Sequence, residues 1–110
     1  MANPKVYAYI GFAARARKCL GGFQGVEGAV RSRKAKLVLG DTGLGENTRE
    51  KLDRMCAQSG IPVLYIDHPG EAAGKHNNMC LAITDEELEV VIDRVCQELG
   101  VTIVEGEQTE

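Results

Sequence analysis

The sequence predicts an α/β fold, a three-layer α/β/α sandwich with a mixed central sheet of about four strands. Two observations lead to this prediction. Short apolar runs, typical of strands that are covered on both faces, recur along the chain. Between them lie longer segments with apolar residues at helical spacing and with capping residues at their ends. Helices that alternate with strands favour a layered sheet with crossover connections.

The first third of the chain predicts helix, short strand and helix. Asn3 and Pro4 are a typical N-cap and first helical residue, and apolar residues at helical spacing extend this helix to about Arg17. Residues 18–21 leave room only for a short strand. Residues 22 to about 33 form a second helix, which its glycines weaken by about 1 kcal/mol each relative to alanine.

The middle of the chain predicts a strand over residues 35–39 and a glycine-rich loop over residues 40–45. Asn47 opens the third helix, Glu50 lies at the capping-box position, and Gly60 ends the helix. The inner face of this helix is predicted to contain Leu52, Met55 and Cys56.

The remaining strands are predicted over residues 62–66 and 79–83, with one helical turn near residues 71–73 between them. If these runs are central strands, their apolar residues lie in one sheet. The residues that test this are Leu37, Val38, Val63, Tyr65, Leu81 and Ile83.

The last helix is predicted to begin at a capping box of Thr84 and Glu87 and to end at Gly100. Its inward residues are Leu88, Val91, Ile92, Val95 and Leu99. Residues 101–104 are either a last edge strand or a loosely packed segment. We therefore expect one domain over residues 1–104 and a disordered acidic tail over residues 105–110.

Composition narrows the class of protein. The 44% apolar content is enough for one core, and no apolar run approaches the ~20 residues of a membrane span. The start lacks a signal peptide's apolar middle. Four cysteines lie far apart, which argues against a disulfide framework or a zinc module, so we expect reduced thiols in a cytoplasmic protein. Burial is the expected state of Cys56, Cys80 and Cys96.

Charge is distributed unevenly. Residues 1–36 hold one acid, Glu27, and eight cations, for a net charge of +7, whereas five cations and fifteen acids give the remainder −10. A basic third on an acidic protein can present one localised patch to phosphate groups. Solvated helix faces are the alternative interpretation. The cations are Lys5, Arg15, Arg17, Lys18, Arg31, Arg33, Lys34 and Lys36.

No motif predicts a catalytic residue, a metal site or a cofactor. The spacing of three between Gly22, Gly25 and Gly28 is not that of the dinucleotide fingerprint. His76 and Cys80 lack the further ligands that a structural zinc site needs. The carboxylates of residues 85–89 are explained by the start of a helix.

Six stretches carry a family resemblance through their order and spacing: residues 11–22, 29–39, 46–52, 61–63, 70–75 and 81–85. Together they resemble the bacterial YlxQ-type branch of the kink-turn-binding ribosomal protein family, the L-seven-Ae and L-thirty-e group. The resemblance covers about residues 5–96. It implies an α/β/α sandwich that binds a sharply bent, structured RNA, such as a kink-turn or ribosomal RNA.

In that family a glycine at the start of the second helix is followed by Asn, Glu and, three residues later, Lys, which contact G·A edges and phosphates. Aligned on Gly22, this chain has Gln24, Gly25 and Gly28 there, and Arg31 is the candidate replacement for the lost cation. The family's second contact is a loop, here the polar residues 74–78. The predicted RNA-contacting residues are Arg15, Arg17, Lys18, Gly22, Gln24, Gly25, Gly28, Arg31, Lys75, His76 and Asn77.

Three functions stay open at this point. The resemblance and the charge distribution favour a non-enzymatic, kink-turn-type RNA-binding protein, with ribosome association as an extension. Gly25, Gly28 and the net charge of −3 fit a protein-interaction or regulatory module that has lost the RNA site. Only the glycine-rich loops favour a small-molecule or nucleotide enzyme. The sequence specifies neither the RNA, nor the protein partners, nor the oligomeric state.

Overall fold

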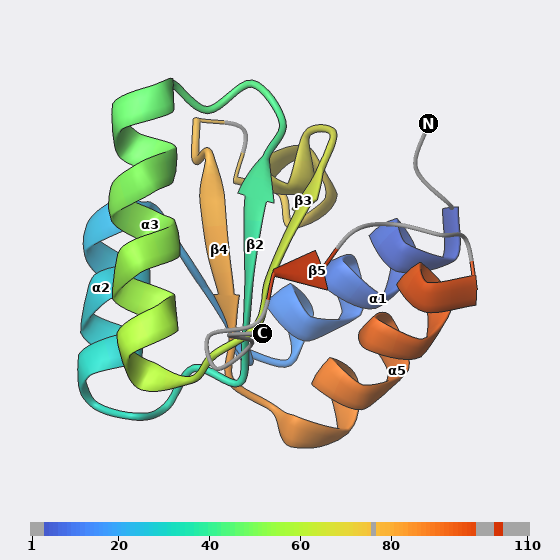
Figure 1. The fold of residues 1–110 in the computed structure, drawn as a ribbon. Helices are drawn as coiled ribbons and strands as arrows, with labels where there is room; N and C mark the ends of the chain where they lie inside the picture. Colours follow the sequence, from blue (N-terminus) through green and yellow to red (C-terminus); the bar gives the residue numbers. More distant parts are fainter. Residues whose placement is uncertain (1–3, 76, 99–102, 105–110) are drawn as a thin grey trace.

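A computed structural model describes residues 4–75, 77–98 and 103–104 (Figure 1). The described residues form five helices and five strands, which alternate along the chain. These elements are α1 (Pro4–Arg15), β1 (Cys19–Gly21), α2 (Phe23–Arg31), β2 (Leu37–Asp41), α3 (Glu46–Ser59), β3 (Val63–Ile66), α4 (Pro69–Ala72), β4 (Cys80–Ile83), α5 (Glu86–Glu98) and β5 (Ile103–Val104).

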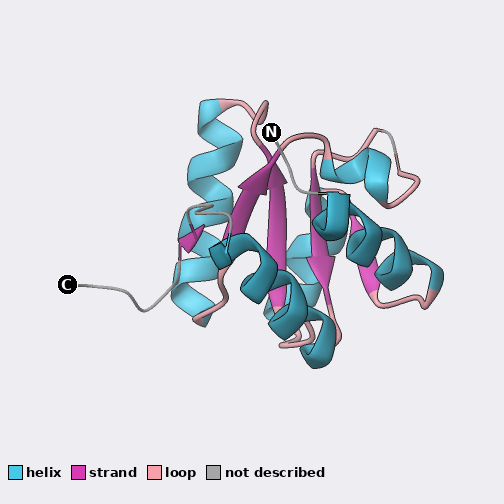
Figure 2. Cartoon of the chain, turned by 90° about the vertical axis from the view of Figure 1, so that its right-hand side faces the viewer, coloured by secondary structure: helices cyan, strands magenta, loops and turns pink. Residues whose placement is uncertain are grey.

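The strands form one mixed sheet in the order β1-β4-β2-β3-β5. Strands β2 and β3 are parallel, whereas β4 is antiparallel to both β1 and β2. Helices α2 and α3 cover one face of the sheet, and α1 and α5 cover the other (Figures 1 and 2). The predicted three-layer sandwich is therefore confirmed, and the two-residue strand β5 adds an edge to the four strands that the sequence indicates.

Two apolar cores lie on the two faces of the sheet because successive side chains of a strand point to opposite faces. Leu37, Leu64 and Ile83 contribute to the core beneath α1 and α5. Val38 and Val63 contribute to the core beneath α2 and α3, where Tyr65 packs at its margin. The strands that carry these residues and Leu81 are neighbours in the sheet, as predicted.

Several boundaries differ from those predicted. Helix α1 ends at Arg15 and α2 at Arg31, each two residues before its predicted end. After each helix the backbone turns through a C-terminal capping motif. Strand β2 starts later than predicted and includes Gly40 and Asp41, which the sequence placed in a loop. Gly40 is suited to this strand because the Tyr65 ring covers its α-carbon, where a side chain would lie 2.5 Å from the ring.

Two predicted caps are wrong. Helix α3 begins at Glu46, after Gly45, and no side chain of the described residues caps it, so Asn47 lies inside the helix. At α5 the cap is Asp85 and not Thr84, because the Asp85 carboxylate accepts the N–H of Glu87 at 2.8 Å. The predicted end of α3 is confirmed, since Gly60 is left-handed with φ 70°.

Among the cysteines whose side chains the structure describes, Cys56 and Cys80 are buried, as predicted, and so is Cys19. Burial raises the pKa of Cys19 and of Cys80 to about 11, and that of Cys56 to about 12, so these thiols stay protonated at neutral pH. On α5 the predicted inward residues Ile92 and Val95 are buried, and Leu88 packs against the same core.

Some predictions fall outside the described residues. These concern Asn3, His76, the side chain of Cys96, Leu99, Gly100 and the tail over residues 105–110. None of the helices that the structure describes combines the length and the apolar character needed to cross a bilayer.

Candidate functional site

The start of α2 is a bare helix N-terminus held against the sheet. Gly22 precedes the helix with φ 85°, and its N–H donates to the Cys80 carbonyl at 2.9 Å. The first helical bond runs from the Val26 N–H to the Gly22 carbonyl, at 2.9 Å. Within the described part of the chain no side chain caps this end. The N–H groups of residues 23–25 are therefore available to an anion.

The loop before β4 lies over this helix start. The Lys75 N–H donates to the Gly70 carbonyl at 2.7 Å, and the Asn78 N–H donates to the Lys75 carbonyl at 3.0 Å. A carbon attached to Gly21 would lie 2.3 Å from the Asn78 amide nitrogen and 2.7 Å from the Lys75 side chain. Only glycine at position 21 leaves room for these two side chains beside the helix start.

A cavity of about 320 Å³ opens between the helix start, the loop and the beginning of α3. It combines apolar walls with a few polar groups, as ligand-binding sites commonly do. Its lining residues are Gly22, Phe23, Leu44, Thr48, Asn77, Asn78, Met79 and Cys80.

The sequence prediction missed Asn78, Leu44 and Thr48 in this cavity. Asn78 is the last residue of the polar loop over residues 74–78. This loop was predicted from the sequence as a contact, but Asn78 was not included among the predicted RNA-contacting residues. Leu44 and Thr48 follow β2, and the pairing of Gly40 with Cys80 brings the end of β2 beside the beginning of β4. No local sequence pattern predicts that strand pairing.

The next residues of α2 are open to solvent. Gln24 and Gly28 are exposed, and Gly25 is half-buried. A side-chain carbon at Gly25 would meet only Leu20, at 3.9 Å, and one at Gly28 would meet nothing within 4 Å. Neither glycine has a positive φ. The predicted contacts of Gly22, Gln24, Gly25 and Asn77 thus fall on one surface with Lys75.

Most of the predicted cations lie elsewhere. Arg31 is in the last turn of α2, about 12 Å along the helix from Phe23, and pairs with Glu27 at 2.9 Å. Arg17 and Lys18 precede β1, about 10 Å or more from Gly22, which follows that strand. Arg17, Lys18 and Arg31 therefore lie away from the start of α2, because α2 and β1 carry these cations towards the other end of the sheet.

Arg15 also lies apart from the start of α2. It ends α1, and its guanidinium points back along that helix, where a carbon attached to Gly11 would lie 3.6 Å from the Arg15 Nη1. Lys75 is the predicted cation that the structure brings beside Gly21 and the helix start.

The described residues contain no group of three or more His, Cys, Asp or Glu side chains placed to hold a metal ion. In the carboxylate run at the start of α5, Asp85 accepts the N–H groups of Glu87 and Leu88, at 2.8 and 3.4 Å. That carboxylate has a capping role.

Comparisons with known proteins agree with this architecture. No protein-family model matches the sequence. The RNA-binding protein YlxQ of Bacillus subtilis is 29% identical over 89 residues, which cover 78% of this chain and 89% of that protein. A protein of unknown function from Bacillus halodurans has the same fold with a TM-score of 0.81 and 28% identity, over 86% of this chain and 99% of that chain.

The 15.5kD RNA binding protein of Giardia lamblia is a more distant structural neighbour. Its TM-score is 0.71 at 17% identity, over 91% of this chain and 92% of that chain, which shows a shared fold. The YlxQ match supports the predicted resemblance: this chain is similar to the YlxQ-type branch of the L-seven-Ae-like family.

Proposed function

We propose that this protein binds RNA of the kink-turn type through the α2-start surface. This surface consists of Gly22, Gln24, Gly25, Lys75, Asn77 and Asn78. We further propose that the protein is non-enzymatic, acts in the cytoplasm and associates with ribosomal or ribosome-linked RNA. The relatives named above as RNA-binding proteins support the general activity.

The observation that carries the proposal is the set of uncapped N–H donors at the start of α2. The N–H groups of residues 23–25 point out of a helix whose cap has no side chain, and the positive end of the helix dipole favours negative charge there. Lys75 adds a cation beside them, since its side chain packs over Gly21. A phosphate oxygen at this position would receive both kinds of contact.

The neighbouring polar groups are suited to base edges. Gln24 is exposed on the first turn, and its amide can donate and accept, which a guanine or adenine edge requires. Asn77 and Asn78 line the adjacent cavity of about 320 Å³, whose wall also includes Phe23. Phosphate contacts position a protein, whereas such edge contacts carry specificity.

The direct test is a fluorescence titration of the wild-type protein with two RNAs of equal length. One contains a kink-turn, and in the other the G·A pairs are replaced by Watson–Crick pairs, so that the duplex is not bent. We expect tighter binding of the kink-turn. Equal affinities would contradict kink-turn specificity and leave general RNA binding. Absence of binding to both would contradict the proposal as a whole and favour a protein-interaction module.

A matched pair of variants locates the site. Lys75→Ala removes the cation beside the helix start, and Lys51→Ala removes an exposed cation on α3. We expect Lys75→Ala to weaken binding and to lower the slope of log affinity against log salt by about 0.7–0.9, and Lys51→Ala to change neither. Equal effects of the two variants would show that only net charge matters.

A further inference from the structure

Three helices end at the same end of the sheet, opposite the start of α2. The Lys18 carbonyl accepts the Thr84 N–H at 2.9 Å, and the Lys36 N–H donates to the Ile83 carbonyl at 2.7 Å. Both bonds lie where β4 ends, whereas Gly22 is bonded to Cys80, where β4 begins. The first and last residues of this four-residue strand are about 10 Å apart.

Helices α1 and α2 finish with the same backbone turn. After α1, the Arg17 N–H donates to the Ala14 carbonyl at 3.1 Å, and the Lys18 N–H to the Ala13 carbonyl at 2.8 Å. After α2, residues 33 and 34 repeat the pattern, with N–H bonds to the carbonyls of residues 30 and 29 at 3.1 and 2.8 Å. These are Schellman motifs, in which one residue is left-handed.

An arginine occupies the left-handed position in both turns. Arg17 has φ 62° and Arg33 has φ 63°, whereas α3 ends in the same manner with Gly60 at φ 70°. Glycine adopts this conformation without a steric penalty, and a long side chain does not. Residues in sparsely populated backbone conformations cluster at functional sites, which points to a use of these two side chains. That use is not helix capping, because backbone N–H groups already satisfy the last carbonyls.

These turns gather a cationic surface that we call the basic edge. It consists of Arg17, Lys18, Arg33, Lys34 and Lys36, all of which are exposed. None of the five has an ion-pair partner among the residues that the structure describes, whereas Arg31, close by, is paired with Glu27. Five unpaired cations on a protein of net charge −3 form a local positive field.

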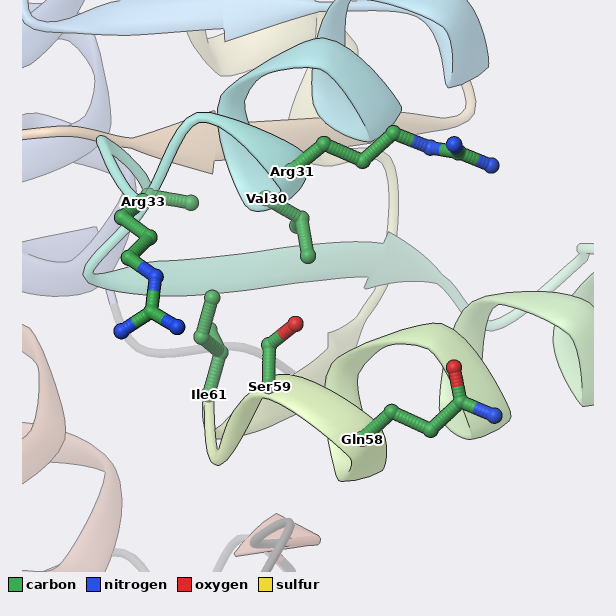
Figure 3. Close-up of a pocket in the computed structure, with 7 residues that line it drawn as sticks. Val30, Arg31, Arg33, Gln58, Ser59 and Ile61 are labelled. Atoms are coloured by element: carbon green, nitrogen blue, oxygen red, sulfur yellow. The ribbon is translucent and has the colours of Figure 1, made fainter.

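A cavity of about 370 Å³ lies at the α2 and α3 side of the basic edge (Figure 3). Val30 and Ile61 form its apolar floor, and Arg33, Ser59 and Gln58 place polar groups around it. Thr84, which is bonded to Lys18, is followed by acids that begin α5, on the other face of the sheet. There the Asp85 carboxylate is occupied in capping. An anionic ligand is therefore favoured on the α2 and α3 face.

We propose that the basic edge is a second RNA-contacting surface, which binds backbone phosphates without reading bases. This inference rests on the proposed RNA-binding function and extends it. Helix α2 joins the two surfaces, with its start at one and its end at the other. An RNA that lies along α2 contacts both, so the affinity depends on the length of helical RNA that flanks the specific element.

The test replaces both left-handed arginines by glycine, Arg17→Gly with Arg33→Gly. Because glycine suits a positive φ, this variant is expected to unfold at a temperature no lower than wild type, so lost binding does not reflect lost folding. Arg54→Ala with Arg94→Ala is the control, since it removes two exposed arginines from α3 and α5. Both variants are titrated with kink-turn RNA and with unbent duplex over a range of salt concentrations.

We expect the Arg17→Gly, Arg33→Gly variant to bind both RNAs more weakly and to lower the salt slope by about 1.4–1.8 for two phosphate contacts. The preference for the kink-turn over the duplex should not change. Wild-type affinity and slope in this variant, or an equal loss in the control, would overturn the second surface while leaving the proposed function intact. Absence of RNA binding by wild type would overturn both.

Discussion

Gly25→Glu with Gly28→Lys restores at two positions the residue types that the family resemblance leads one to expect. Both sites accept side chains, since a carbon at Gly25 would lie 3.9 Å from Leu20 and one at Gly28 has open space. Glycine in a helix costs about 1 kcal/mol relative to alanine, and Glu and Lys about half of that or less. The two changes together should stabilise the fold by about 1 kcal/mol, which raises the Tm by about 4 °C or more.

The effect on RNA should be selective. A carboxylate at position 25 can accept from a guanine edge, and an ammonium at position 28 adds a charge-assisted contact. Each contact contributes about 1–3 kcal/mol, so both together improve kink-turn affinity by about 30-fold or more. The pair adds one negative and one positive charge, so affinity for an unbent duplex should hardly change.

Titration of wild type and the double variant with both RNAs, together with a thermal melt, decides the matter. A gain for the kink-turn alone would support the α2-start surface as its site. If the variant melts higher but binds the kink-turn no better, the reasoning about this surface is refuted. An equal gain for both RNAs would instead indicate a contribution of the lysine to phosphate binding only.

Three further predictions concern stability in urea. Gly70→Ala should cost about 1–3 kcal/mol because the added carbon would lie 2.3 Å from the Asn78 carbonyl oxygen; unchanged stability would show that the loop moves freely. Asp85→Ala should cost about 1 kcal/mol and Thr84→Ala less, since Asp85 is the cap of α5. A larger loss in Thr84→Ala would show that Thr84 is the cap, as the sequence predicted. Burial raises the pKa of Cys56 from about 9 to about 12, so the folded state favours the protonated thiol. The contribution of this thiol to the free energy of unfolding is complete below pH 9 and is lost as the pH rises towards 12. Between pH 8 and pH 10 wild type should therefore lose more stability than Cys56→Ala, and equal losses would contradict the raised pKa.

The sequence predicted the layered architecture because apolar runs and helical spacing are local signals. Leu64, for example, lies in an unbroken apolar run, and in the structure it is fully buried between two layers of helices. Strand order depends instead on pairing between distant segments. The placement of β4 between β1 and β2 has no local signature, because it depends on pairing between residues far apart in the sequence.

Cap assignments failed where several capping residues follow one another. Thr84 and Asp85 both suit a helix start, and the choice depends on where β4 stops. Ile83 is the last residue to pair in that strand, so Thr84 completes the sheet bonding through its N–H to Lys18 and Asp85 remains to cap the helix. A one-residue difference in strand length therefore moves the cap.

Proximity in sequence misled the prediction of the site. Gly22, Gln24 and Lys75 were chosen from local pattern and resemblance, and the structure places them on one surface. Arg31 was chosen because it follows Gly28 by about one turn, yet the ion pair with Glu27 and its place in the last turn remove it from the helix start. The grouping of cations at turns required knowledge of where each helix ends.

The bond between the Gly22 N–H and the Cys80 carbonyl joins residues that are 58 positions apart. Its amide hydrogen exchanges with solvent only when β1 and β4 separate at this end of the sheet. The α2-start surface therefore does not form independently of β4. A synthetic peptide of residues 19–31 would lack the partner that orients its first turn, and grafting that segment onto another scaffold would have to bring an equivalent of β4 with it.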